Sequence, residues 1–158
     1  MGNTVGSTST NFCNFFSNEK DAYILGLWCA DGYWWSSSIG LSNIDSDLIG
    51  IFQRFLKRHF PEDRIRFNRN HLFVNSRPLL REFILSKKKL DGLKNAGAVR
   101  AYFAGRFDGE SAKTFCLYIS RYEVEKFLNN ILPYSAKLQK LVLVPRRDLT
   151  LARAKRVK

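Results

Sequence analysis

The stretch that decides the fold is ILGLWCADG at residues 24–32, which has a counterpart, FAGRFDGES, at residues 103–111. Both are typical of a helix end in which two small residues stand four positions apart and an acidic residue follows at once. Because small residues four apart share one helix face, we expect the two helices to pack closely through these faces. The matched positions are Gly26 with Gly105, Ala30 with Gly109, and Asp31 with Glu110.

The two acidic residues, Asp31 and Glu110, would then meet at the end of the helix pair. This placement is unfavourable by itself, because neighbouring carboxylates repel each other and the C-terminal end of a helix disfavours an anion. Divalent cations would remove both penalties. One such stretch alone is typical of ordinary packing and of a helix C-cap. Two copies in register on a basic chain favour a functional site at Asp31 and Glu110.

Helices and short hairpins alternate around the first stretch, which is typical of an α+β fold with an antiparallel sheet. Pro61 is expected to end the second helix, since the residue before a proline avoids helical backbone. The expected elements are a helix from a cap at Ser17 or Asn18 to about 30, a hairpin over 33–43 with its turn at 36–38, a helix over 46–59, a hairpin with strands 64–67 and 72–75, and a helix over 78–85.

The same order is predicted to return in the second half. Its expected elements are a helix over 99–108, a hairpin that ends with 115–119, a helix behind a capping box of Ser120 and Glu123, and a basic hairpin with strands 141–144 and 149–153. We therefore predict an internal duplication of an αββαββ(α) unit, whose second copy is truncated before its last helix. The predicted parts are a flexible segment 1–16, a first repeat 17–86, a linker 87–98 and a second repeat 99–158.

The composition favours a polyanionic partner. The chain of 158 residues carries 26 Lys and Arg against 14 Asp and Glu, a net charge of +12, which is typical of nucleic-acid binding. No apolar run reaches the roughly 18 residues of a membrane helix, and the N-terminus does not resemble a secretory signal. Three widely spaced cysteines and two histidines favour neither a zinc site nor a disulfide framework.

With two such motifs on a basic chain, residues 18–158 resemble the LAGLIDADG homing endonucleases in their single-chain, two-motif form. The eighth position of each motif is acidic, as that family requires, and is occupied by Asp31 and Glu110. Three positions differ from the family pattern: Cys29 stands at an often acidic sixth position, Arg106 stands where an apolar residue is usual, and Ser111 replaces a closing glycine.

The resemblance implies that each half contributes a curved antiparallel sheet and that the two sheets form a saddle along the DNA major groove. It also implies that the motif helices form the interface between the halves. Asp31 and Glu110 would bind two or three Mg²⁺ ions across the minor groove, where metal-bound water would attack phosphorus. One chain with both motifs would act on double-stranded DNA as a monomer. It would work in the cytoplasm or in the compartment of its host genetic element. An intron-encoded product is favoured over an intein, because the chain ends without a His-Asn junction.

Polar and basic side chains in or beside the hairpins are the candidates for DNA contact. Arg and Lys can read guanine, Asn can read adenine, and hydroxyls can bind bases or phosphates, while a two-stranded ribbon fits the major groove. Trp34 and Trp35 are expected to pack within the fold rather than to stack on bases. The candidates are Ser36, Ser38, Arg64, Arg66, Asn68, Arg69, Asn75, Arg77, Lys113, Lys137, Lys140, Arg147, Arg153 and Lys155.

Three other functions stay open. An RNA maturase that assists intron splicing would use the same fold and would retain both acids. A DNA-binding regulator on a degenerate scaffold is disfavoured, because loss of the metal ligands would be its expected mark. A small basic ribosome-associated protein would have no use for the matched acids.

Overall fold

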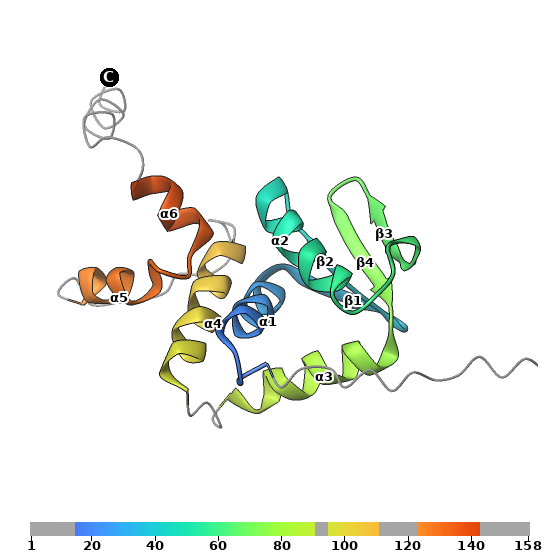
Figure 1. The fold of residues 1–158 in the computed structure, drawn as a ribbon, viewed down its shortest axis with the longest axis horizontal. Helices are drawn as coiled ribbons and strands as arrows, with labels where there is room; N and C mark the ends of the chain where they lie inside the picture. Colours follow the sequence, from blue (N-terminus) through green and yellow to red (C-terminus); the bar gives the residue numbers. More distant parts are fainter. Residues whose placement is uncertain (1–14, 91–94, 111–122, 143–158) are drawn as a thin grey trace, which may run out of the picture.

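A computed structural model describes residues 15–90, 95–110 and 123–142 of the chain. These residues form an α+β fold with one antiparallel sheet, as predicted (Figure 1). The elements are α1 (Glu19–Asp31), β1 (Gly32–Trp35), β2 (Ser38–Ser42), α2 (Ser46–Lys57), the 3-10 helix η1 (Glu62–Arg64), β3 (Ile65–Asn68), β4 (His71–Asn75), α3 (Arg77–Lys88), α4 (Ala96–Gly109), α5 (Val124–Ile131) and α6 (Ala136–Val142).

The sheet has the strand order β1-β2-β4-β3 with every neighbouring pair antiparallel. Ile39 and Leu41 of β2 lie opposite Val74 and Leu72 of β4, and all four side chains are buried. They belong to one core with apolar residues of α1, α2 and α3. Because side chains alternate along a strand, the residues between them face away from this core and form the outer face of the sheet.

Both hairpins are closed by two-residue turns whose first residue has a positive φ. These residues are Ser36, with φ 55°, and Arg69, with φ 54°. A positive φ at the first turn position fits the right-handed twist of a tight hairpin but is unusual for a residue with a side chain. The turn predicted at 36–38 is confirmed, as is a turn between the strands predicted at 64–67 and 72–75, and the register places the two tips at opposite ends of the sheet.

Local capping explains the helix starts. The side chains of Asn18, Asp45 and Ser76 accept hydrogen bonds from backbone amides in the first turns of α1, α2 and α3. Of the two caps considered for the first helix, Asn18 is therefore the one in place. Arg64, predicted to begin a strand, instead ends η1, which follows Pro61.

Three boundaries differ from the sequence expectations. Phe15, within the segment 1–16 predicted to be flexible, is buried, and its ring lies 4.4 Å from that of Phe83. Helices α3 and α4 extend into the predicted linker 87–98, because a side-chain cap at Asn95 starts α4 early. Residues 136–142 form α6, so the strand predicted from residue 141 is wrong at its start. The rest of that hairpin and the hairpin before α5 lie outside the described residues, and the duplication of the whole unit stays a prediction.

Candidate active site and nucleic-acid interface

Helices α1 and α4 cross with their backbones in contact at Gly26 and Gly105 (Figure 1). A Cβ atom at Gly26 would lie 1.9 Å from the carbonyl oxygen of Tyr102, and one at Gly105 would lie 2.0 Å from that of Tyr23. The two contacts are reciprocal, since each tyrosine stands three residues before the glycine of its own helix. The crossing therefore has local two-fold symmetry, and only glycine fits at its centre.

The second pair of small residues continues this contact toward the helix ends. A Cβ at Gly109 would lie 2.6 Å from the Cβ of Ala30 and 3.1 Å from the carbonyl oxygen of Leu27. Asp31 is the last residue of α1, and Glu110 directly follows α4. The close crossing thus brings the C-terminal ends of both helices, with their acidic residues, to the same part of the molecule.

Each of these two carboxylates has a different partner. The side-chain amide of Asn43, which follows β2, donates a 2.5 Å hydrogen bond to Oδ2 of Asp31. Nε of Arg106, one turn earlier in α4, donates a 3.2 Å hydrogen bond to Oε1 of Glu110. Burial raises the pKa of Asp31, and the charge of Glu110 raises it further, whereas Asn43 and Lys137 act to lower it. The carboxylates of Asp31 and Glu110 therefore lie close enough for their charges to repel each other.

This arrangement fits a magnesium ion. Mg²⁺ binds in proteins through one or two carboxylates, and water and substrate phosphates complete its octahedral shell. Residues 15–90, 95–110 and 123–142 contain no group of three or more His, Cys, Asp and Glu side chains that could hold a metal ion. The repulsion between Asp31 and Glu110 would be relieved by a divalent cation beside them.

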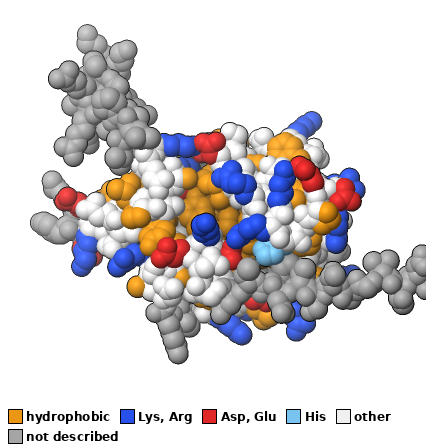
Figure 2. Space-filling model, in the orientation of Figure 1, with side chains coloured by type: hydrophobic (Ala, Val, Ile, Leu, Met, Phe, Trp, Pro, Cys, Tyr) orange, Lys and Arg blue, Asp and Glu red, His pale blue; other side chains and the backbone are white. Residues whose placement is uncertain are grey.

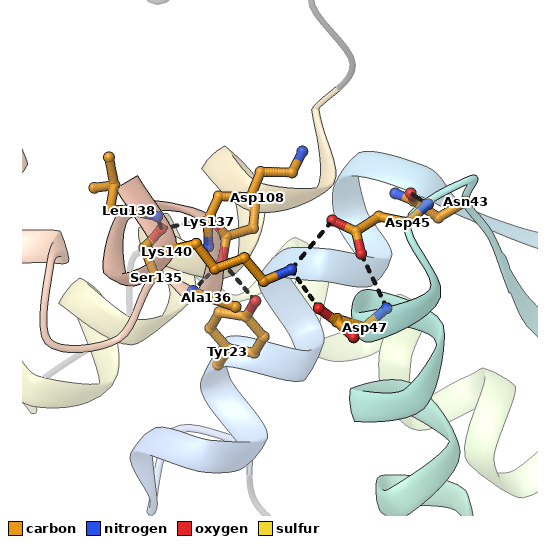
Figure 3. A network of polar contacts seen from close by, with 10 residues as sticks. All are labelled: Tyr23, Asn43, Asp45, Asp47, Asp108, Ser135, Ala136, Lys137, Leu138 and Lys140. Atoms are coloured by element: carbon orange, nitrogen blue, oxygen red, sulfur yellow. Dashed lines mark hydrogen bonds and ion pairs between the residues drawn. The ribbon is translucent and has the colours of Figure 1, made fainter. Parts of the chain in front are cut away.

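A buried carboxylate, Asp108 of α4, holds the start of α6 in place (Figure 3). The hydroxyl of Tyr23 donates to it at 2.7 Å, the hydroxyl of Ser135 at 2.5 Å, and the backbone amides of Ala136 and Lys137 at 2.6 Å and 3.4 Å. Asp108 thus caps the N-terminus of α6 from another helix, where an anion is favoured. Sequence reasoning missed Asp108, although it stands at the sixth position of the second motif, the position that Cys29 occupies in the first.

Helix α6 carries two of the predicted DNA contacts, Lys137 and Lys140. The positive charge of Lys137 acts on Asp31, so this lysine lies on the side of the carboxylate pair. The ammonium group of Lys140 forms an ion pair with Asp47 and lies 3.9 Å from Oδ2 of Asp45 (Figure 3). Lys140 therefore connects α6 to the start of α2. The sequence predicted Lys140 as a DNA contact and did not predict these ion pairs within the protein.

Four of the predicted DNA contacts project from the outer face of the sheet. Ser38 and Asn75 are opposite each other in the β2–β4 register, and Oγ of Ser38 donates a 2.5 Å hydrogen bond to Oδ1 of Asn75. Arg66 and Asn68 lie on the same face of β3 and are exposed. The sheet thus presents hydroxyl, amide and guanidinium groups together, as base readout in a groove requires.

The other candidates lie around this face or beyond the described residues. Ser36 and Arg69 occupy the two hairpin tips, and Arg77 begins α3 after the cap residue Ser76. Nη2 of Arg64 donates a 3.2 Å hydrogen bond to the backbone oxygen of Asn75, at the end of β4. The candidates outside the described residues are Lys113, Arg147, Arg153 and Lys155.

The two tryptophans of β1 have different surroundings. The ring of Trp34 points to the core side and lies 5.8 Å from that of Trp28. Trp35 is 80% exposed and lies on the outer face beside Ser38. Trp34 is itself 53% exposed, so the expectation of packing fits it only in part, and it does not fit Trp35.

A groove of about 720 Å³ lies apart from the carboxylate pair. Tyr23, Ile24, Ile51, Phe55 and Tyr134 of α1, α2 and the turn before α6 line its apolar part. Figure 2 shows hydrophobic side chains near the centre of that view, with Lys and Arg around them. Neither Asp31 nor Glu110 lines this groove, so the candidate chemistry lies at the helix ends instead.

A family model for the LAGLIDADG-like domain matches residues 18–132. The chain belongs to the LAGLIDADG family. The match spans both α1 and α4, and the resemblance found in the sequence is confirmed. No curated protein and no solved structure matches the chain.

LAGLIDADG proteins are homing endonucleases and related maturases, which makes this chain a member of a DNA-binding nuclease family.

In the part of the chain that the structure describes, no helix has the length and apolar character needed to cross a membrane. Two of the motif positions that depart from the family pattern, Cys29 of α1 and Arg106 of α4, both interact with the side chain of Tyr102. Cys29 influences the pKa of Tyr102 through its contact, and burial is the main cause that raises this pKa, to about 12.

Proposed function

We propose that this LAGLIDADG protein is a site-specific, double-strand DNA endonuclease that hydrolyses phosphodiester bonds across the minor groove with Mg²⁺. The observation that supports the proposal most directly is the proximity of Asp31 and Glu110 at the ends of two helices that cross at glycines. A two-fold arrangement of carboxylates suits a duplex, whose two strands present their phosphates in a two-fold arrangement as well.

Asp31 and Glu110 would hold the cations, and Asn43 fixes the orientation of Asp31 through its hydrogen bond. When bound, Mg²⁺ supplies an activated water and stabilises the charge of the phosphate and the leaving oxygen. Lys137 brings a positive charge to the Asp31 side, where it would attract a scissile phosphate. Asp108 positions Lys137 by capping the helix that carries it.

The outer face of the sheet would recognise the target in the major groove. Arg66 would read guanine, Asn68 and Asn75 would read adenine, and Ser38 would bind a base or a phosphate. Arg69 at a hairpin tip and Arg77 at the start of α3 suit phosphate contacts beside the strands. With both motifs in one chain, the protein would bind its site as a monomer and would work in the compartment of its host genetic element.

A cleavage assay tests this function. The substrate is a supercoiled plasmid that carries the uninterrupted host sequence, incubated with Mg²⁺, and binding is followed in parallel by gel shift. We expect the parent to linearise the plasmid, and Asp31→Asn and Glu110→Gln to bind it without cutting. Asp63→Asn, which alters an exposed acid in η1, is the matched control and should cut normally. Parent-like cutting by either site variant would remove that acid from the mechanism.

The exposed side chain of Trp35 favours one alternative, an RNA maturase. Unpaired RNA bases stack on aromatic side chains, which a paired duplex does not allow. Tight binding of the parent to its intron RNA, with no cutting of the uninterrupted DNA site, would favour the maturase over the endonuclease.

A further inference from the structure

The two carboxylates of the site differ in charge environment. Glu110 forms an ion pair with Arg106, at 3.2 Å between Oε1 and Nε, and the two side chains are 20% and 34% exposed. Asp31 is bound by the neutral amide of Asn43. Lys137 acts on Asp31 through its charge, and the described residues contain no ion pair between these two side chains. Of the two acids, only Glu110 therefore has a cation from the described residues in direct contact.

This difference arises at equivalent positions of the two helices. A Cβ at Gly26 would lie 2.9 Å from the backbone nitrogen of Arg106, and a Cβ at Gly105 would lie 2.9 Å from that of Leu27. Arg106 and Leu27 thus occupy the same place in the symmetric crossing. Leu27 is fully buried, whereas Arg106 extends along α4 to the carboxylate one turn later. The backbone is symmetric here, and the side chains are not.

The ion pair between Arg106 and Glu110 weakens the binding of a metal cation to Glu110. A guanidinium group stays protonated at all accessible pH values, so it cannot leave the carboxylate by losing its charge. A divalent cation that binds Glu110 must displace Arg106 or lie beside it against charge repulsion. Asp31 imposes no such exchange, since its hydrogen bond from Asn43 carries no charge.

We propose that Arg106 is a counter-cation that competes with divalent metal for Glu110 and makes the two metal positions unequal. Metal binds first beside Asp31, and the Glu110 side binds metal only when Arg106 gives up its contact. The proposal rests on the proposed function, because it takes Asp31 and Glu110 as metal ligands. It adds that the site loads in two steps of different affinity.

Binding of Mn²⁺ to the DNA-free chain, followed by the EPR signal of the free ion, tests the proposal without relying on cleavage. We expect the parent to bind one ion more tightly and a second one roughly two- to fivefold more weakly, the range that a solvent-accessible ion pair contributes. Arg106→Leu, which places the residue type of Leu27 at this position, should bring the second affinity close to the first. Arg100→Leu is the matched control, because it removes an exposed positive charge from the same helix.

Two further variants separate the possible failures. Asp31→Asn should remove the tight site, and the double variant Arg106→Leu with Glu110→Gln should lose the site that Arg106→Leu had strengthened. One outcome would overturn the role of Arg106 and leave the metal site standing. In it, the parent binds two ions with equal affinity, Arg106→Leu changes neither affinity, and Asp31→Asn and Glu110→Gln each lose Mn²⁺ binding. Mn²⁺ binding that ignores both acids would overturn the metal site and the role of Arg106 together.

Discussion

The hydroxyl of Tyr23 in α1 donates a 2.7 Å hydrogen bond to the carboxylate of Asp108 in α4, and both groups are buried. Asp108 also accepts hydrogen bonds from Ser135 and from the first backbone amides of α6. One buried carboxylate therefore joins three helices. The helix that carries Lys137 is held against the motif helices through this group.

Replacing Tyr23 by Phe should destabilise the protein by about 1–3 kcal/mol, because a buried charge-assisted hydrogen bond is lost while the ring is kept. Urea unfolding measures the cost, and faster amide exchange at Ala136 would locate it at the start of α6. Tyr134→Phe is the matched control, since Tyr134 donates to Glu19 at the surface, and it should cost less than about 1 kcal/mol. Equal effects of the two variants would contradict the structural role of Asp108.

The glycines of the helix crossing give a second prediction. A methyl group at Gly26 or Gly105 would lie within 2.0 Å of a backbone oxygen, so each Gly→Ala variant should lose about 1–3 kcal/mol or more through overpacking. Gly50 of α2 is the control, because its nearest side-chain atom would be 3.6 Å from the new methyl. Gly50→Ala should gain up to about 1 kcal/mol from helix propensity. Thermal melts in which Gly26→Ala or Gly105→Ala is as stable as Gly50→Ala would contradict the close crossing.

The raised pKa of Asp31 predicts a pH dependence of stability. Burial and the charge of Glu110 disfavour the ionised form in the folded protein, so ionisation of Asp31 destabilises the fold. This cost is absent below the unfolded pKa of about 3.9 and grows until the pH has passed the raised folded value. In EDTA, Asp31→Asn should therefore be more stable than the parent at neutral pH, and the difference should vanish near pH 3. Urea midpoints between pH 3 and 8 measure it, with Asp63→Asn as the control, and a constant difference would contradict this origin.

The local elements were predictable from the sequence because local residues determine them. Side-chain caps at Asn18 and Ser76, Pro61 after α2, and alternating apolar residues in β2 and β4 all act within a few positions. The helix pair was predictable as well, since two stretches in register each combine small residues four apart with an acid at the helix end. The family match to residues 18–132 agrees with that interpretation.

The features that the sequence did not reveal depend on contacts between distant residues. Helix α6 is capped by Asp108, 27 positions earlier than Ser135, so its seven residues could not be assigned from their neighbours. The ion pair of Lys140 with Asp47 likewise joins residues that only the fold brings together. The exposure of Trp35 depends on where neighbouring elements end, which periodicity does not describe.

The last prediction concerns Trp35, whose ring is exposed on the outer face of the sheet. Stacking of one unpaired base on an aromatic ring contributes about 1–3 kcal/mol, whereas a paired base in a duplex offers only its groove edge. For an endonuclease, Trp35→Ala should weaken binding to the duplex site by less than about 1 kcal/mol, with Arg66→Ala costing about 1–3 kcal/mol at a single base pair. Gel shifts on single-base variants of the site measure both losses.

The same variants separate the two candidate functions. A maturase would show the opposite order on intron RNA, since Trp35→Ala would remove a stacking platform and Trp35→Phe would restore part of it. Phe67→Ala is the control, because Phe67 is also an exposed aromatic residue, at 63%, but lies on the core side of the edge strand β3. A loss at Phe67 as large as at Trp35 would show that exposed aromatic area, and not the outer face, governs binding.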